Sequence, residues 1–185
     1  MSNTDNLKKQ FLSDIHLAQK KFEFYEKFYR DISGDRKKYL QACSKAYKKE
    51  SLALRKIIQP HINKNCPKCD GCCKLYDPEL SIYMSDSIGV FEFIDYLLVR
   101  CDTVLPDISI NNMEENLCAF WAYGCSLPDD CRSFTCMQWF CDTLKTELDM
   151  RAISKHLGVL ESVIKNFSVK KCLGLDTEFS SRNLD

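Results

Sequence analysis

Apolar residues recur every three or four positions through the first third of the chain. Over residues 5–32 the steps between them are 4, 4, 3, 4, 3, 3 and 4, the repeat of a helix with one buried face. A second such stripe follows Ser33-Gly34-Asp35 and ends before Pro60, so the pattern predicts a hairpin of two helices. The stripe positions are Leu7, Phe11, Ile15, Ala18, Phe22, Tyr25, Phe28 and Ile32, then Tyr39, Ala42, Ala46, Ala53 and Ile57.

The remainder of the chain alternates between helical patterns and irregular stretches. Helical spacing is found at residues 88–101, from Pro128 to about Met150, and at 153–167, while the alternation at 80–84 predicts one short strand. Turn-forming residues and cysteines indicate loops at residues 64–77 and 102–117. We therefore expect a mainly α fold. An N-terminal helical hairpin at residues 1–62 would precede a small, irregular, cysteine-rich domain at residues 63–185.

Charge is distributed unevenly along the chain. The whole chain is neutral, with 26 basic and 26 acidic residues, which disfavours a protein that coats polyanions through bulk charge. Residues 1–65 nevertheless hold 15 Lys/Arg against 7 Asp/Glu, and residues 66–185 hold 11 against 19. The lysine-rich stretches of the hairpin are interpreted as a solvated face. The alternative is a surface for an acidic partner, with a protein favoured over nucleic acid.

The chain contains 12 cysteines, and the sequence predicts a reducing compartment for them. No run of 18 apolar residues indicates a membrane span, and MSNTDNLKKQ lacks the apolar stretch of a secretory signal. We therefore expect a cytoplasmic protein, in which disulfides do not persist. A secreted disulfide framework is the alternative explanation of the even cysteine count. Neither a G-x-G-x-x-G loop nor a P-loop is present, which excludes two common nucleotide sites.

The first cysteine group consists of two overlapping C-x-x-C turns. Cys66-Pro67-Lys68-Cys69-Asp70-Gly71-Cys72-Cys73 contains the spacing C-x-x-C-x-x-C, which directs several thiolates towards one point. Such turns bind zinc in knuckle motifs, and the same spacing supplies three ligands to bacterial-type iron–sulfur clusters. The pattern predicts a metal site without identifying the metal.

The second group is more widely spaced. Its members are separated by six, five and four residues: Cys118, Cys125, Cys131 and Cys136. Two of them are expected near the start of a helix beside Arg132, and both features favour the thiolate form. These cysteines alone are also compatible with a buried core, but beside the first group they are better interpreted as the other half of one site. The remaining cysteines are scattered: Cys43, Cys101, Cys141 and Cys172.

Together the two groups resemble a known family. C-x-x-C-x-x-C-C, a later C-x(6)-C pair with glycine before the second cysteine, and C-R-x-F-x-C are similar to a cysteine-cluster family described as a zinc- or iron-chelating domain. Flagellin lysine N-methylase belongs to the wider family. The resemblance covers about residues 66–140, and the chain departs from it at Leu127-Pro128-Asp129-Asp130. The resemblance implies eight metal ligands: Cys66, Cys69, Cys72, Cys73, Cys118, Cys125, Cys131 and Cys136.

Eight thiolates exceed what one mononuclear site can use. Either two zinc ions take four cysteines each, or one [4Fe–4S] cluster takes four and the others pack or hold a second metal. Lys68, Lys74 and Arg132 are candidates to offset the negative charge, and His61 is a candidate to replace one cysteine. Aromatic residues near the second group are expected to shield the site from water: Phe120, Trp121, Tyr123, Phe134, Trp139 and Phe140.

Three functions follow from these features. The leading hypothesis is a metal-binding protein whose clustered cysteines chelate an iron–sulfur cluster or zinc. The first alternative, implied by the resemblance alone, is an S-adenosylmethionine-dependent lysine N-methylase-like enzyme. The second alternative is an interaction module, in which the metal is structural and the basic hairpin binds a protein partner. The sequence does not decide whether the protein is catalytic.

Overall fold

The protein is mainly α-helical, as the sequence predicts. The computed structural model describes residues 3–65, 93–114, 118–120, 122, 125–138, 140 and 142–174. Within these ranges the helices are α1 (Asn3–Asp31), α2 (Gly34–Asn65), α4 (Phe93–Arg100), α5 (Ile110–Glu114), α6 (Phe134–Gln138), α7 (Asp142–Glu147), α8 (Met150–Asn166) and α9 (Val169–Leu173). The described ranges contain no β-strand. The strand expected at 80–84 and the first cysteine group, Cys66 to Cys73, lie outside them.

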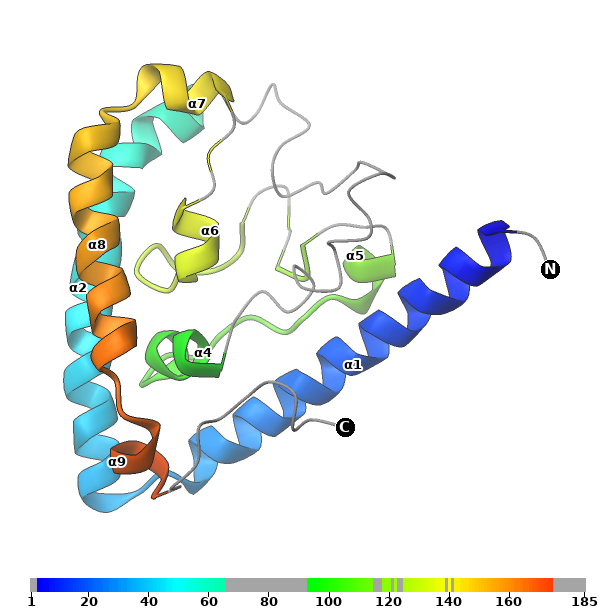
Figure 1. The fold of residues 1–185 in the computed structure, drawn as a ribbon, viewed down its shortest axis with the longest axis horizontal. Coiled ribbons are helices and arrows are strands. Elements are labelled where there is room, and N and C mark those ends of the chain that lie inside the picture. The colour runs from blue at the N-terminus through cyan, green and yellow to red at the C-terminus, as the bar shows by residue number, and fades with distance from the viewer. Residues whose placement is uncertain are drawn as a thin grey trace.

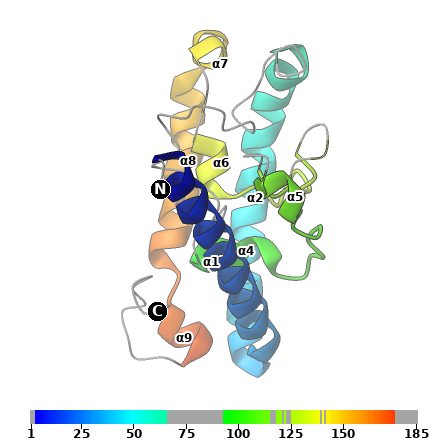
Figure 2. The same ribbon diagram turned by 90° about the vertical axis from the view of Figure 1, so that its right-hand side faces the viewer.

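Two long helices form one edge of the molecule. Helices α2 and α8 pack side by side along most of their length, and α7 lies near the C-terminal end of α2 (Figure 1). Helix α1 leaves the start of α2 at an acute angle, and α4, α5 and α6 lie between α1 and the α2–α8 pair (Figures 1 and 2). None of the described helices is both long and apolar enough to cross a membrane.

The two predicted N-terminal helices are present and are joined by a short turn, but they diverge instead of packing along each other as a hairpin (Figure 1). Gly34 has a φ of +57°, a left-handed conformation that glycine adopts without a steric penalty, and it reverses the chain between α1 and α2. The predicted stripe of α1 is buried at Ile15, Ala18, Phe22 and Tyr25. Its aromatic members pack against Phe93 and Tyr96 of α4, among other rings. This aromatic contact holds α1 against the interior.

Helix α2 is longer than the sequence predicts. The expectation that it ends before Pro60 is wrong, because the helix continues through this proline to Asn65. Its last turn is held by Glu147 of α7, whose carboxylate accepts hydrogen bonds from Lys64 at 2.8 Å and Asn65 at 3.0 Å. Hydrogen bonds from Lys64, Asn65 and His61 lower the pKa of Glu147 to about 2. These tertiary contacts compensate for the backbone hydrogen bond that a proline removes.

The buried face of α2 is not the predicted apolar stripe. The side chains that α2 buries are Leu40, Ser44, Tyr47, Ser51, Leu54 and Ile58. Polar residues occupy this face because neighbouring elements supply their partners. Ser44 donates to the Leu98 carbonyl at 2.6 Å, and Ser51 contacts the sulfur of Met137 at 3.3 Å. The predicted stripe members Ala42 and Ala46 are exposed instead.

A buried carboxylate joins three helices. Asp95 of α4 is 4% exposed, accepts a hydrogen bond from the Tyr47 hydroxyl of α2 at 2.6 Å, and accepts another from the Phe134 backbone N–H at 2.8 Å. Burial, followed by the charge and hydrogen bond of Asp95, raises the pKa of Tyr47 well above its usual value. Tyr47 therefore remains the hydrogen-bond donor, and Asp95 fixes where α6 begins.

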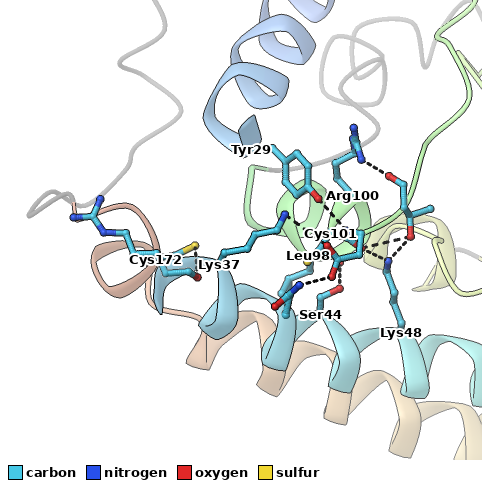
Figure 3. Close-up of polar contacts among 12 residues, drawn as sticks. Tyr29, Lys37, Ser44, Lys48, Leu98, Arg100, Cys101 and Cys172 are labelled. Atoms are coloured by element: carbon cyan, nitrogen blue, oxygen red, sulfur yellow. Dashed lines mark hydrogen bonds and ion pairs between the residues drawn. The ribbon is translucent and has the colours of Figure 1, made fainter. Parts of the chain in front are cut away.

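The C-terminal end of α4 is anchored to α2 by polar contacts. The Lys48 ammonium donates to the Cys101 carbonyl and the Thr103 hydroxyl, both at 2.5 Å. Lys48 and Ser44 project from the same side of α2 towards this end, as Figure 3 shows. These contacts hold the chain where it leaves α4.

The chain turns sharply just after α4. Asp102 has a φ of 54°, a left-handed conformation that aspartate tolerates better than most residues. Its carboxylate accepts from Gln41 at 2.9 Å and lies 3.7 Å from the Lys37 ammonium, while its backbone N–H donates to the Tyr29 hydroxyl at 2.9 Å. The Gln41 hydrogen bond, opposed by desolvation, holds the pKa of Asp102 below its usual range. Contacts from α1 and α2 thus stabilise an uncommon conformation.

The C-terminal half differs in part from the sequence-based expectation. The single helix expected from Pro128 to about Met150 is wrong, since this stretch contains the two short helices α6 and α7. The loop expected at 102–117 includes the short helix α5. The last helix is confirmed as α8, where Asp149 caps the first turn by accepting hydrogen bonds from Arg151 and Ala152.

Removing the Tyr47 hydroxyl should destabilise the fold. We expect Tyr47→Phe to lower the free energy of unfolding by about 1–3 kcal/mol, because Asp95 loses a buried donor. Urea denaturation followed by circular dichroism measures this loss. Tyr29→Phe is the matched control, since it deletes a hydroxyl that makes a more exposed hydrogen bond. An equal or smaller loss for Tyr47→Phe would contradict a stabilising role for the Asp95 contact.

Candidate metal centre

Local backbone contacts bring two cysteines of the second group together. Ser126 folds back on Phe120, with its backbone N–H donating to the Phe120 carbonyl at 2.9 Å and its hydroxyl donating to the same oxygen at 2.8 Å. The resulting loop returns Cys125 to the neighbourhood of Cys118. Desolvation is the largest cause of the raised pKa of Cys118, and the Cys125 charge acts in the same direction.

A third cysteine reaches the same region from α6. Ser133 begins this short helix and accepts a hydrogen bond from the Cys136 backbone N–H at 3.1 Å. Although Cys136 has an exposed surface, protein surrounds it closely, and desolvation with the neighbouring Cys118, Cys125 and Asp95 raises the pKa of its thiol to about 12. The structure therefore groups Cys118, Cys125 and Cys136, and we call these the three-thiol group.

The fourth predicted cysteine lies on another side. Cys131 is fully buried, and its thiol lies 3.4 Å from the Asp130 carboxylate. Desolvation raises the pKa of Cys131, a Thr103 hydrogen bond and the Lys48 charge lower it, and Asp130 raises it. The ionisation of Cys131 therefore depends mainly on residues near the C-terminal end of α4, and not on the three-thiol group.

Two arginines flank the three-thiol group. Arg132 and Arg55 contact the same oxygen of Asp129, at 3.2 Å and 3.1 Å, and the side chains of the two arginines are 8% and 15% exposed. The Arg132 charge favours the thiolate of Cys118, and Cys125 acts in the corresponding way on Arg55. The sequence singles out Arg132 as a charge-balancing residue, and the structure places it beside these thiols.

The two arginines share one carboxylate, and Arg132 affects the ionisation of Arg55. Desolvation, and then the charge of Arg132, lower the pKa of Arg55, as expected when two guanidinium groups lie close together. Desolvation opposes ionisation of Asp129, but hydrogen bonds from Arg132 and Arg55 outweigh it and lower its pKa. One carboxylate thus serves two cations. The Nε of Arg132 is buried and has no hydrogen-bond partner among the described residues.

The described side chains do not by themselves form a complete metal site. No group of three or more His, Cys, Asp or Glu side chains in the described ranges has an arrangement that could hold a metal ion. His61, a candidate ligand by sequence, has its Nδ1 3.3 Å from Glu147 at the end of α2. The first-group ligand candidates Cys66, Cys69, Cys72 and Cys73 lie outside the described residues, as do Lys68 and Lys74.

Sequence reasoning missed several residues around the centre. Arg55 belongs to a helix whose charges were expected to be solvated, and Asp129 was noted as part of the stretch that departs from the family pattern. Nothing in their spacing indicates that they meet, because the contact joins residues 74 positions apart. Asp95 carries a weak signal, as a charge within an otherwise apolar helix.

Three cysteines that are scattered in the sequence also approach one another. Cys172 of α9 is buried, and its thiol lies 4.0 Å from the Arg36 carbonyl of α2 (Figure 3). Desolvation, with Cys43 and Cys101 acting in the same direction, raises the pKa of Cys172 to about 11. High thiol pKa values keep such cysteines neutral, which suits packing in the core.

No protein-family model, no curated protein and no solved structure matches this chain. The resemblance to the cysteine-cluster family therefore rests on the cysteine pattern and stays a prediction.

The Cys136 thiol should react slowly in the metal-free protein. With a pKa of about 12 it ionises far less at pH 8 than an ordinary thiol. We expect alkylation by iodoacetamide at pH 8 to be about tenfold or more slower than that of glutathione, with a rate that still rises above pH 10. Peptide mass spectrometry measures the modification at this site. A rate equal to that of glutathione, levelling off near pH 9, would contradict this description of its surroundings.

Proposed function

We propose that the chain binds zinc or an iron–sulfur cluster through cysteines of both sequence groups. The observation that carries the proposal is the pair of arginines beside the three-thiol group, one of which has a buried N–H without a partner among the described residues. Arg55 and Arg132 are largely buried and share the single carboxylate of Asp129. Partly buried cations of this kind are costly unless anions accompany them.

Metal-bound thiolates would be anionic groups that lie beside these arginines. A site of four cysteine thiolates carries a net charge of about −2, whether the metal is Zn²⁺ or a [4Fe–4S]²⁺ cluster. The unpartnered Nε of Arg132 is suited to donate a hydrogen bond to a thiolate sulfur, a common contact around such centres. The chemistry of the described groups therefore fits an anionic metal–thiolate site.

The raised pKa values of the thiols determine how metal binding would depend on pH. Neutral thiols with high pKa values become metal ligands only by releasing their protons. Cys118 and Cys136 both have raised pKa values in the metal-free chain. We therefore expect metal binding to release protons and to strengthen as the pH rises.

The ligand set combines described and predicted residues. Cys118, Cys125 and Cys136 are the proposed ligands from the described part of the chain. The first group, Cys66 to Cys73, is proposed to supply the remainder, as the sequence pattern predicts. The surroundings of Cys131 make it a less suitable ligand than the other three cysteines of its group. All-thiolate coordination suits zinc and iron–sulfur centres equally, so the test must identify the metal.

Metal analysis of selected variants tests this function. We expect protein purified without oxygen to contain about one to two zinc ions per chain, or iron and sulfide with broad absorption near 400 nm. The triple variant Cys118→Ser, Cys125→Ser, Cys136→Ser should retain about tenfold less metal. Elemental analysis and the visible spectrum provide the measurement.

Cys43→Ser is the matched control for these variants. It replaces a half-buried cysteine outside both sequence groups and should leave the metal content unchanged. Folded wild-type protein without metal would rule out the proposed function, as would a triple variant that keeps its full metal content.

The Arg132→Gln variant should show whether Arg132 balances the charge of the metal site or only stabilises the fold. In metal-free protein we expect little loss of stability, because the substitution removes repulsion between two cations. In loaded protein we expect metal to be lost to a chelator about tenfold faster, since the thiolates lose a cation and a donor. Chelator competition and urea denaturation give the two readouts. A large loss of stability with an unchanged rate of metal release would assign Arg132 to the fold alone.

A further inference from the structure

An open groove runs along the outer side of the α2–α8 pair. Its volume is about 550 Å³, and residues of both helices line it. Helix α2 contributes Tyr39, Ala42, Cys43 and Ala46, while α8 contributes Lys155, Gly158, Val159, Ser162, Val163 and Asn166. Small side chains thus form much of the floor, and Val159 is 43% exposed within it.

The groove contains part of the predicted apolar stripe, including two alanines that remain exposed. Tyr39, Ala42 and Ala46 have the spacing of a buried helical face, yet α2 turns a different set of residues inward. A helical face of this kind is normally covered. In the described part of the chain these alanines remain exposed.

Gly158 gives independent support. A glycine within a helix is destabilising, so it is usually explained by a close contact or by an unusual backbone conformation. At Gly158 a Cβ atom would meet nothing within 4 Å, and no left-handed φ requires a glycine there. Packing among the described residues therefore does not explain the glycine at this position. Close approach by the backbone of another molecule would explain it.

Lysines border the groove on the α2 side. Lys38, Lys45, Lys49 and Lys56 follow one another at steps of 7, 4 and 7 residues, which places them on a single helix face. That face adjoins Ala42 and Ala46, and Lys155 adds a cation from α8. Among the described residues, Lys45, Lys49 and Lys155 form no ion pair with an acidic side chain, so the border is basic.

We propose that this groove docks an acidic amphipathic helix of a partner protein. Its apolar face would lie on the small residues, as in other helix-in-groove complexes, and its carboxylates would meet the lysines. A second copy of this chain fits poorly, since a symmetric contact would bring the same lysines together. Nucleic acid fits less well too, because the floor is mostly small and aliphatic rather than made of aromatic stacking surfaces.

A labelled model peptide tests the proposal on the full-length, metal-loaded protein. The probe is a fluorescein-labelled amphipathic helix of leucine and glutamate, compared with a scrambled peptide of the same composition. Fluorescence anisotropy should show tighter binding of the amphipathic peptide, weakening as salt increases. Lys45→Glu with Lys49→Glu should weaken binding by about tenfold, whereas the α1 control Lys20→Glu with Lys27→Glu should not.

Gly158→Leu tests the apolar floor separately from charge. The substitution fills the groove and favours the helix, so the fold is retained while peptide binding falls by about tenfold. Equal binding of the amphipathic and scrambled peptides would overturn the proposal. The proposal would also be overturned if the protein bound phosphatidylserine vesicles or single-stranded DNA more tightly than the amphipathic peptide. In that case the lysine reversals would abolish binding and Gly158→Leu would leave it unchanged. The metal content of each variant should be unaffected, which keeps this test distinct from that of the metal centre.

Discussion

The buried carboxylate of Asp95 is the contact on which the interior depends. An ionised carboxylate inside a protein is strongly unfavourable unless donors surround it. Here α2 provides the Tyr47 hydroxyl and the start of α6 provides the Phe134 N–H, so Asp95 joins three helices. Phe134 lies two residues before Cys136. The interaction that assembles the core therefore also sets the position of a candidate ligand.

Helix α2 connects this interior to the candidate centre. Tyr47 and Arg55 lie about two turns apart on it, one contacting Asp95 and the other Asp129. Both belong to the segment that charge and spacing assign to an N-terminal hairpin, yet both contact the cysteine-rich part of the chain. The basic side chains of α2 therefore have different environments. Some remain in solvent, whereas Arg55 is largely buried beside Arg132 and the three-thiol group.

Local periodicity predicted what depends on local structure. The two N-terminal helices and α8 follow from apolar spacing. The sequence grouped Cys131 with Cys118, Cys125 and Cys136, and did not show that Cys131 has different surroundings. The buried face of α2 was not predictable in this way, because Ser44 and Ser51 are buried only where Leu98 and Met137 meet them. The break between α6 and α7 and the pairing of Arg55 with Asp129 likewise depend on contacts between distant parts of the chain.

The choice of the buried face on α2 has a consequence on the opposite side of the molecule. Helix α2 buries Ser44, Tyr47 and Ser51 because neighbouring elements supply their hydrogen-bond partners. Its alanines Ala42 and Ala46 are therefore left exposed. Those alanines form a surface only because α8 lies alongside and presents Gly158 and Ser162 rather than bulky side chains. The orientation of α2 about its own axis thus determines both which polar side chains are buried and which small side chains line the groove. An apolar sequence pattern that predicts a buried helix face can therefore form part of the surface.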